Sequence, residues 1–97
     1  MISPSAVAAL GNAYAHVKQL DKAVEYLKKA ASMADNEAAD NTNNSISPIF
    51  LLQAGEILES QGKKSEALQI YQDIKTKYLN SAVSQDIDKY IERVSVK

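Results

Sequence analysis

The sequence predicts an all-α fold, in which two antiparallel helical hairpins and a C-terminal capping helix form a small α-α superhelix. Three observations predict it: a pattern of apolar and small residues occurs twice, a Ser-Pro pair precedes each copy, and an apolar stripe follows the second copy. Repetition of this kind is typical of stacked helical units. The first copy is Leu10, Gly11, Tyr14, Ala23, Leu27 and Ala30, and the second is Ala54, Gly55, Leu58, Ala67, Tyr71 and Ile74.

The glycines indicate that each copy is a hairpin. In both copies a glycine precedes an alanine by the same number of residues, as in Gly11 with Ala23 and Gly55 with Ala67. A glycine on one helix that faces an alanine on the next lets two antiparallel helices approach closely, and larger apolar residues seal the contact. We therefore expect Gly11 and Gly55 to lie at close helix contacts.

The helix ends follow from Ser, Pro and Gly. Ser3 and Ser47 can each cap a helix, because each stands directly before a proline that is well tolerated in the first turn. Gly62 is expected to end the third helix. We predict a single domain over residues 1–97, with helices at about 4–17, 21–36 or somewhat beyond, 48–61, 65–78 and 81–94. The repeats then occupy about 4–37 and about 48–81.

The segment at about 36–47 is an insertion of about ten residues relative to a repeat of about 34 residues. Two interpretations stay open. Either the second helix continues through Asp40 and a solvated loop follows, or the segment is a binding loop or a hinge for domain swapping. Its Asp and Asn residues superficially suggest a calcium loop, but Ser45 and Leu51 stand where such a loop requires glycine and glutamate.

The predicted capping helix, at about 81–94, is apolar on one side only. Such a helix can cover the last hairpin of a stacked array, which would otherwise expose its core. Its apolar stripe is Ile87, Tyr90, Ile91 and Val94, and its polar side carries Asp88, Lys89, Glu92 and Arg93.

Composition narrows the function classes. The 97 residues carry 11 basic and 12 acidic side chains, so no excess of positive charge attracts phosphate and we expect no nucleic acid partner. Cysteine is absent, which excludes thiolate chemistry but fits either redox compartment. No apolar run is long enough to span a membrane and no signal peptide is recognisable. We expect no membrane contact by this segment, and its localisation stays open.

No residue pattern supports catalysis. His16 is the only histidine, and a catalytic or metal-binding histidine needs partners that this sequence does not supply. Glu56 and Glu59 lie one helical turn apart and could act as paired carboxylates, but a solvated or partner-facing acidic patch is the simpler interpretation. We expect no enzyme, no cofactor and no metal site.

The repeated pattern resembles the tetratricopeptide repeat, which places leucine, glycine and tyrosine on its first helix and alanine, an aromatic residue and alanine on its second. Val7 occupies the slot that often holds tryptophan, and Tyr71 occupies the aromatic slot of the second copy. The sequence departs from the family at Asp35 and Leu79, which replace a favoured proline. The stretch from 54–59 to 88–93, taken as a whole, is also similar to the C-terminal region of tetratricopeptide proteins of Bacteroides-type bacteria.

The resemblance implies a non-catalytic protein-interaction module. In this family the first helix of each hairpin lines a concave groove that binds a peptide or protein segment. Ile49 and Leu52 in that groove are either covered by the insertion or the fifth helix, or they contact another chain. A carboxylate clamp, as in chaperone-binding members, is not expected, because Ala8 and Gln53 replace clamp residues. The inner positions that could contact a partner are Asn12, His16, Ile49, Leu52, Glu56 and Glu59.

A structural role is the second interpretation. Because about three repeats are usually needed for stability, the chain could extend a longer array, or form a homodimer or a domain swap through the 36–47 insertion. We also expect the encoding gene to carry further helical repeats ahead of Met1.

Overall fold

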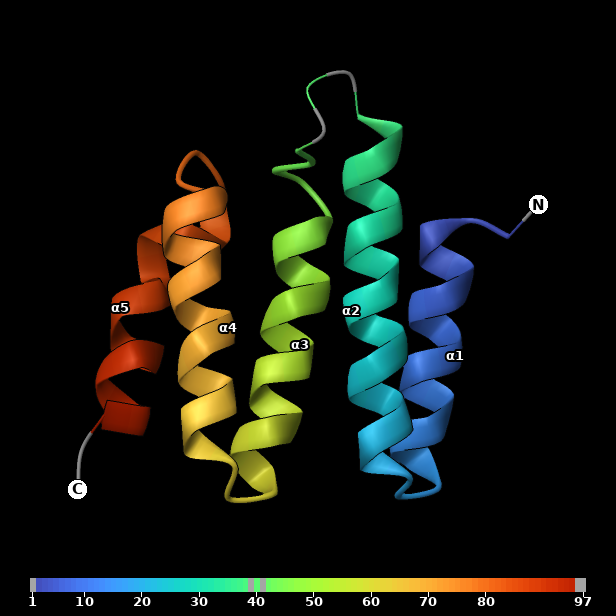
Figure 1. The fold of residues 1–97 in the computed structure, drawn as a ribbon, viewed down its shortest axis with the longest axis horizontal. Coiled ribbons are helices and arrows are strands. Elements are labelled where there is room, and N and C mark those ends of the chain that lie inside the picture. Colours follow the sequence, from blue (N-terminus) through green and yellow to red (C-terminus); the bar gives the residue numbers. More distant parts are fainter. Residues whose placement is uncertain (1, 39, 41, 96–97) are drawn as a thin grey trace.

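The computed structural model describes residues 2–38, 40 and 42–95, and in this part of the chain all regular structure is helical. The helices are α1 (Pro4–His16), α2 (Leu20–Glu37), α3 (Ser47–Ser60), α4 (Lys64–Lys77) and α5 (Ala82–Ser95). Figure 1 shows the hairpins α1–α2 and α3–α4 side by side, with both hairpin turns at the same end and the inserted loop at the other. The predicted all-α architecture is confirmed, with helix ends within a few residues of those expected.

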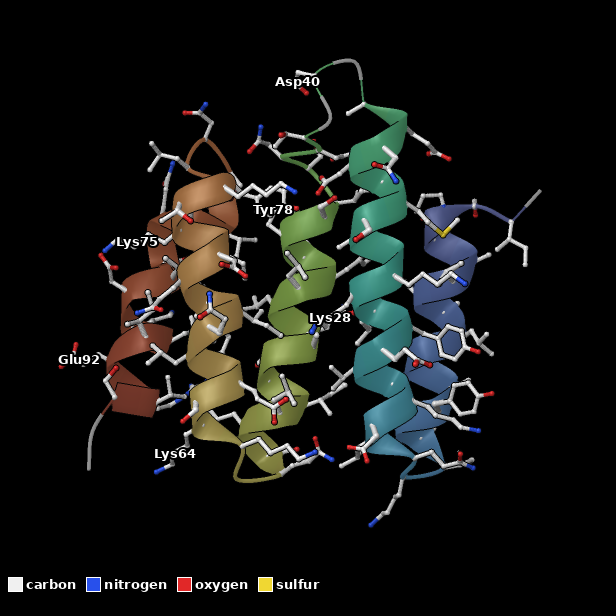
Figure 2. The ribbon with its side chains drawn as sticks, viewed as in Figure 1. Lys28, Asp40, Lys64, Lys75, Tyr78 and Glu92 are labelled. Carbon is white, nitrogen blue, oxygen red and sulfur yellow. The ribbon has the colours of Figure 1, made fainter. Side chains whose placement is uncertain are left out.

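Each helix packs against its neighbours along the chain, and α5 also contacts α3. The core lies between the helices and is built largely from the repeated positions. An ion pair of 2.7 Å between Lys75 on α4 and Asp88 on α5 supports the packing of the capping helix from outside (Figure 2). The residues with no exposed surface in the core are Ala23, Leu27, Ala30, Ala54, Ala67, Tyr71, Ile74 and Ile87.

The two hairpin glycines lie at close contacts, as predicted. A Cβ atom built on Gly11 would lie 3.1 Å from the Ala23 carbonyl oxygen, across the α1–α2 contact. A Cβ atom on Gly55 would lie 2.5 Å from Cε1 of the Tyr71 ring, which is closer than real Cβ contacts allow. Packing between the two helices of a hairpin therefore excludes a side chain at Gly55 and leaves little room for one at Gly11.

Both hairpin turns use the same backbone motif at the end of the first helix. In the first turn the Gln19 N–H donates to the Tyr14 carbonyl, and in the second the Lys63 N–H donates to the Leu58 carbonyl, at 2.9 Å in each case. This motif requires one residue with a positive φ. That residue is Gly62 (φ 76°) in the second turn, where it ends α3 as predicted, but Lys18 (φ 62°) in the first.

We predict that Lys18→Gly stabilises the protein by about 0.5 to 1 kcal/mol, because a side chain with a Cβ is strained at positive φ and glycine is not. The measurement is the urea midpoint by circular dichroism. The same substitution at Lys22, within α2, is the control and should lower stability by about 1 kcal/mol, since glycine is unfavourable inside a helix. A lower midpoint for Lys18→Gly would show that the turn is not strained.

The two Ser-Pro pairs differ in structure. Ser3 caps α1 as predicted, because its hydroxyl oxygen accepts the Ala6 N–H at 3.1 Å. The same prediction for Ser47 is wrong, since Ser47 is fully buried and its hydroxyl donates to the Ala31 carbonyl and to Asp35. The Asn43 side-chain oxygen instead accepts the N–H groups of Ser45 and Ile46, in the turn just before α3.

The inserted segment is a loop. The prediction that the second helix continues through Asp40 is wrong, because α2 ends at Glu37 and Ala38 is extended, with φ −80° and ψ 148°. Asp40 forms a local turn instead, in which its carboxylate accepts the Thr42 N–H at 3.1 Å. The chain reverses here so that Ser47 can return to α2, which a longer helix would prevent. Residues 39 and 41 lie outside the described residues.

Candidate functional site

The predicted inner positions of α1 lie together on its surface. Asn12 and His16 are exposed and, with Ala15 between them, line a shallow depression. One helical turn separates the two polar side chains, so a partner that lies along α1 could contact both. The amide of Asn12 offers one acceptor and two donor hydrogens to such a partner.

On α3 the predicted positions differ in burial. Ile49 has 43% of its surface exposed, so neither the inserted loop nor α5 covers it. Leu52 is half-buried and packs against the core. Glu56, one turn further along, is exposed, and among the described residues no cation lies within ion-pair distance of it. Exposed apolar surface beside an unneutralised carboxylate is thus available on this helix.

Glu59 forms an ion pair and hydrogen bonds with other residues of the same chain. Arg93 on α5 contacts both of its carboxylate oxygens, with Nε 2.6 Å from Oε2 and an Nη atom 2.8 Å from Oε1, and the Tyr71 hydroxyl donates to Oε1 at 2.9 Å. The Arg93 guanidinium holds the pKa of Glu59 below its ordinary value, against the opposing effect of burial. Burial and the bond to Glu59 raise the pKa of the Tyr71 hydroxyl. Glu59 therefore ties α3 to α4 and α5.

Two residues of α5, Tyr90 and Arg93, belong to the same surface, although neither is among the predicted binding residues. Arg93 lies 4.9 Å above the ring centroid of Tyr90, and the Tyr90 ring is 5.5 Å from that of Tyr71. Because α5 contacts α3 directly, this aromatic and cationic pair lies next to Glu59. The sequence did contain a signal for these two residues. Tyr90 follows Glu56, and Arg93 follows Glu59, at the repeat distance of about 34 residues, which indicates equivalent positions.

Comparison with known proteins bears on the first hairpin. Residues 4–37 match the tetratricopeptide repeat family, and this range covers both α1 and α2. Residues 4–37 form a tetratricopeptide repeat. No curated protein and no solved structure matches the chain, and the resemblance to Bacteroides-type proteins gains no support from these comparisons. The matched repeat is of a typically non-catalytic kind and no catalytic family is found.

The tetratricopeptide repeat departs from its pattern at Asp35, and this residue is the centre of a buried polar cluster. Asp35 is only 5% exposed, yet it accepts four hydrogen bonds from three parts of the chain. Its Oδ1 atom accepts from the Asn43 N–H and the Ser47 hydroxyl, both at 2.8 Å. Its Oδ2 atom accepts from Lys77 at 3.0 Å and from the Tyr78 hydroxyl.

The cluster keeps Asp35 ionised. Burial opposes the charge, but the bonds from Tyr78, Asn43, Ser47 and Lys77 together hold the pKa of Asp35 below its ordinary value. Burial and the carboxylate in turn raise the pKa of Tyr78. Figure 2 shows Tyr78 at the end of α4 that is nearest the inserted loop, on which Asp40 lies further out. One carboxylate thus fixes the loop, the start of α3 and the end of α4 to α2.

An exposed contact joins the hairpins at their other end. The carboxylate of Asp21, in the first turn of α2, accepts from the Gln61 amide and from Lys63, each at 3.1 Å. The bond from Gln61 and the charge and hydrogen bond of Lys63 lower the pKa of Asp21. Within the described ranges no helix is long and apolar enough to cross a bilayer, and no group of three acidic, histidine or cysteine side chains is placed to hold a metal ion.

Proposed function

We propose that the chain is a protein-interaction module that binds a peptide or protein segment on the surface shared by α1, α3 and α5. Tetratricopeptide repeats generally mediate protein–protein interactions, and residues 4–37 are such a repeat. The observation that carries the proposal is the exposed apolar side chain of Ile49. On the same helix, Ile49 precedes Leu52 by about one turn and Glu56 by about two turns. An apolar anchor beside a polar contact is typical of peptide-binding surfaces.

The second hairpin is proposed as a second repeat of the same family, over residues 48–81. Two features of the second hairpin support this interpretation: α3 and α4 are joined by the same backbone turn as α1 and α2, and they share the close glycine contact. The capping helix α5 then occupies the place of the first helix of a third repeat. The six proposed partner-binding residues are Asn12, His16, Ile49, Leu52, Glu56 and Glu59.

The charges on this surface favour a basic and apolar partner segment. Glu56 has no cation beside it among the described residues, so it supplies the negative charge, while Glu59 acts mainly by holding Arg93 in place. Ile49 and Leu52 provide the apolar contact and Asn12 a hydrogen-bonding amide. Opposite charge on the partner increases the association rate and the selectivity of such a contact.

We predict that Glu56→Lys weakens binding of a basic peptide about tenfold, because attraction becomes repulsion at the edge of the contact. The peptide is selected from a random display library against the wild-type chain, and its affinity is measured by fluorescence polarisation. The control reverses an exposed pair on α2, Glu25→Lys with Lys29→Glu, and should leave affinity unchanged. Helicity by circular dichroism should be the same in both variants.

A peptide that is insensitive to Glu56→Lys but responds to substitutions in the 36–47 insertion would place binding on the inserted loop instead. The structural interpretation, in which the chain extends an array or exchanges a hairpin through this insertion, predicts no affinity for short peptides. It predicts instead a change of mass with protein concentration.

A further inference from the structure

A groove lies between α2 and α4, with α3 as its floor. Both α2 and α4 pack on α3, and among the described residues they do not pack closely on each other. Figure 1 shows α3 between these two helices. Two hollows lie along the groove, one of about 350 Å³ beside Leu51 and one of about 170 Å³ beside Leu58, and Asp73 lines both of them. We call this feature the α2–α4 groove.

The α2–α4 groove is separate from the proposed peptide-binding surface. A helix turns by about 100° per residue, so Glu56 lies about 140° around α3 from Leu51 and about 160° from Leu58. The two surfaces are therefore on nearly opposite sides of α3. The residues that line the hollows belong to α2, α3 and α4, with Tyr78 directly after α4. The groove thus does not depend on any element before α1 or after α5.

The floor of the groove is apolar and matches the spacing of a helix. Leu51 is half-buried, and Leu58 is buried together with Val24 and Ile70 on the two walls. Leu51 and Leu58 are seven residues apart, which is about 10.5 Å along a helix. A helix that lies along the groove presents its own residues at this spacing on one face, so two side chains can enter the two hollows together. In an extended strand, side chains on one face recur about every 6.7 Å, which does not match.

The two walls of the groove carry opposite charges that do not meet. Lys28, labelled in Figure 2, lies between α2 and α4. Glu66 and Asp73 line the facing wall, and they are also seven residues apart. All three side chains are exposed, and among the described residues none of them has an ion-pair partner. The groove is therefore wide enough to keep Lys28 apart from the acidic side chains of α4.

We propose that the α2–α4 groove binds an amphipathic helix of a partner protein. Two apolar residues of that helix, seven positions apart, enter the two hollows. Its basic residues lie on the flank that faces Glu66 and Asp73, and an acidic residue on the other flank faces Lys28. Charged flanks beside an apolar seam fix partner choice and orientation in helix pairs. The charges also set the direction of the bound helix, since reversing a helix exchanges its two flanks.

The test uses two helical peptides of about 20 residues, long enough to form helix in water. Both carry two leucines seven residues apart. The first peptide has lysines on one flank of the leucines and glutamates on the other, and the second has glutamates on both flanks. Fluorescence polarisation measures the affinities. We expect the wild-type chain to bind the first peptide about tenfold more tightly, because the second places glutamates opposite Glu66 and Asp73 in either direction.

Four variants locate the binding. Glu66→Lys combined with Asp73→Lys should reverse the preference between the peptides, because both walls are then basic. Ser32→Trp should weaken binding of the first peptide at least about tenfold, since its ring occupies the hollow beside Leu51. Gln72→Trp, at an exposed position of α4 outside both hollows, is the matched control and should leave affinity unchanged. Glu56→Lys should also leave it unchanged, which separates the groove from the surface proposed above.

Several outcomes overturn the proposal. The first is no binding of the first peptide at high micromolar concentration, and the second is a preference that survives the charge reversal of α4. The third is binding that Glu56→Lys weakens and Ser32→Trp does not, which would place the peptide on the other surface. A form of the first peptide with proline in its middle cannot make a continuous helix. Equal affinity for that form would show that the groove takes an extended segment instead of a helix.

Discussion

Asp35→Ala is expected to lower the free energy of unfolding by about 3 kcal/mol, because it leaves the buried Tyr78 hydroxyl and the Asn43 N–H without their acceptor, whereas the Ser47 hydroxyl keeps the Ala31 carbonyl. Lys77 is half exposed and can return to water, so most of the loss comes from the buried hydrogen-bond donors. Urea denaturation at neutral pH measures the effect. Asp73→Ala removes an exposed carboxylate that, among the described residues, accepts only from Gln69, and it should change stability by less than about 0.5 kcal/mol.

The pH dependence gives a second measurement of the same interaction. The pKa of Asp35 is lower in the folded protein than in the unfolded chain, so the carboxylate stabilises the fold above its unfolded value of about 3.9. That contribution is lost as the pH falls through the folded value. The difference in stability between the wild type and Asp35→Ala should therefore shrink below about pH 4. A difference that is already small at neutral pH would mean that the cluster does not stabilise the fold.

Gly55→Leu is expected to cost about 3 kcal/mol, at the upper end of the range for overpacking. Even a Cβ atom at this position would lie 2.5 Å from the ring of Tyr71, and this ring has no exposed surface and a hydroxyl bonded to Glu59. The ring therefore cannot move aside without breaking further contacts. Urea midpoints measure the loss, and an unchanged midpoint would remove the close-contact interpretation.

Two further variants show where the Gly55→Leu penalty arises. Tyr71→Leu, added to Gly55→Leu, should relieve part of the cost, since adjacent residues couple in a double-mutant cycle. Gly62→Ala should cost about 1 kcal/mol by a different mechanism, because nothing lies within 4 Å of a Cβ there but φ is positive.

Local patterns predicted the helices well, but they did not predict the long-range polar contacts. The repeat spacing predicted both hairpins and the contacts of Gly11 and Gly55, because helix packing depends on residues at fixed offsets within a hairpin. Asp35 and Tyr78 are far apart in the sequence, and nothing in the local pattern of either indicates the other. Ser47 was assigned as a cap for the same reason, since its local context resembles that of Ser3.

In the candidate site, too, the sequence predicted local positions but not long-range polar contacts. The family resemblance predicted Asn12, Ile49 and Glu56 at inner positions, and all three side chains are exposed. For Ile49 the sequence left open whether another element covers it. The register alone did not show that Glu59 is paired with Arg93, since this depends on the contact between α3 and α5. The charge of the surface is consequently less negative than the sequence suggested.

Besides the packing of α2 on α3, two polar contacts join the hairpins, and they lie at opposite ends of α2 and differ in exposure. Salt screens the exposed pair of Asp21 and Lys63 far more than it screens the buried cluster around Asp35. When the exposed pair opens, the hairpins remain joined by the packing of α2 on α3 and by the buried Asp35 cluster. Any loosening between the hairpins at high ionic strength should therefore be confined to the end of the molecule that carries the two hairpin turns.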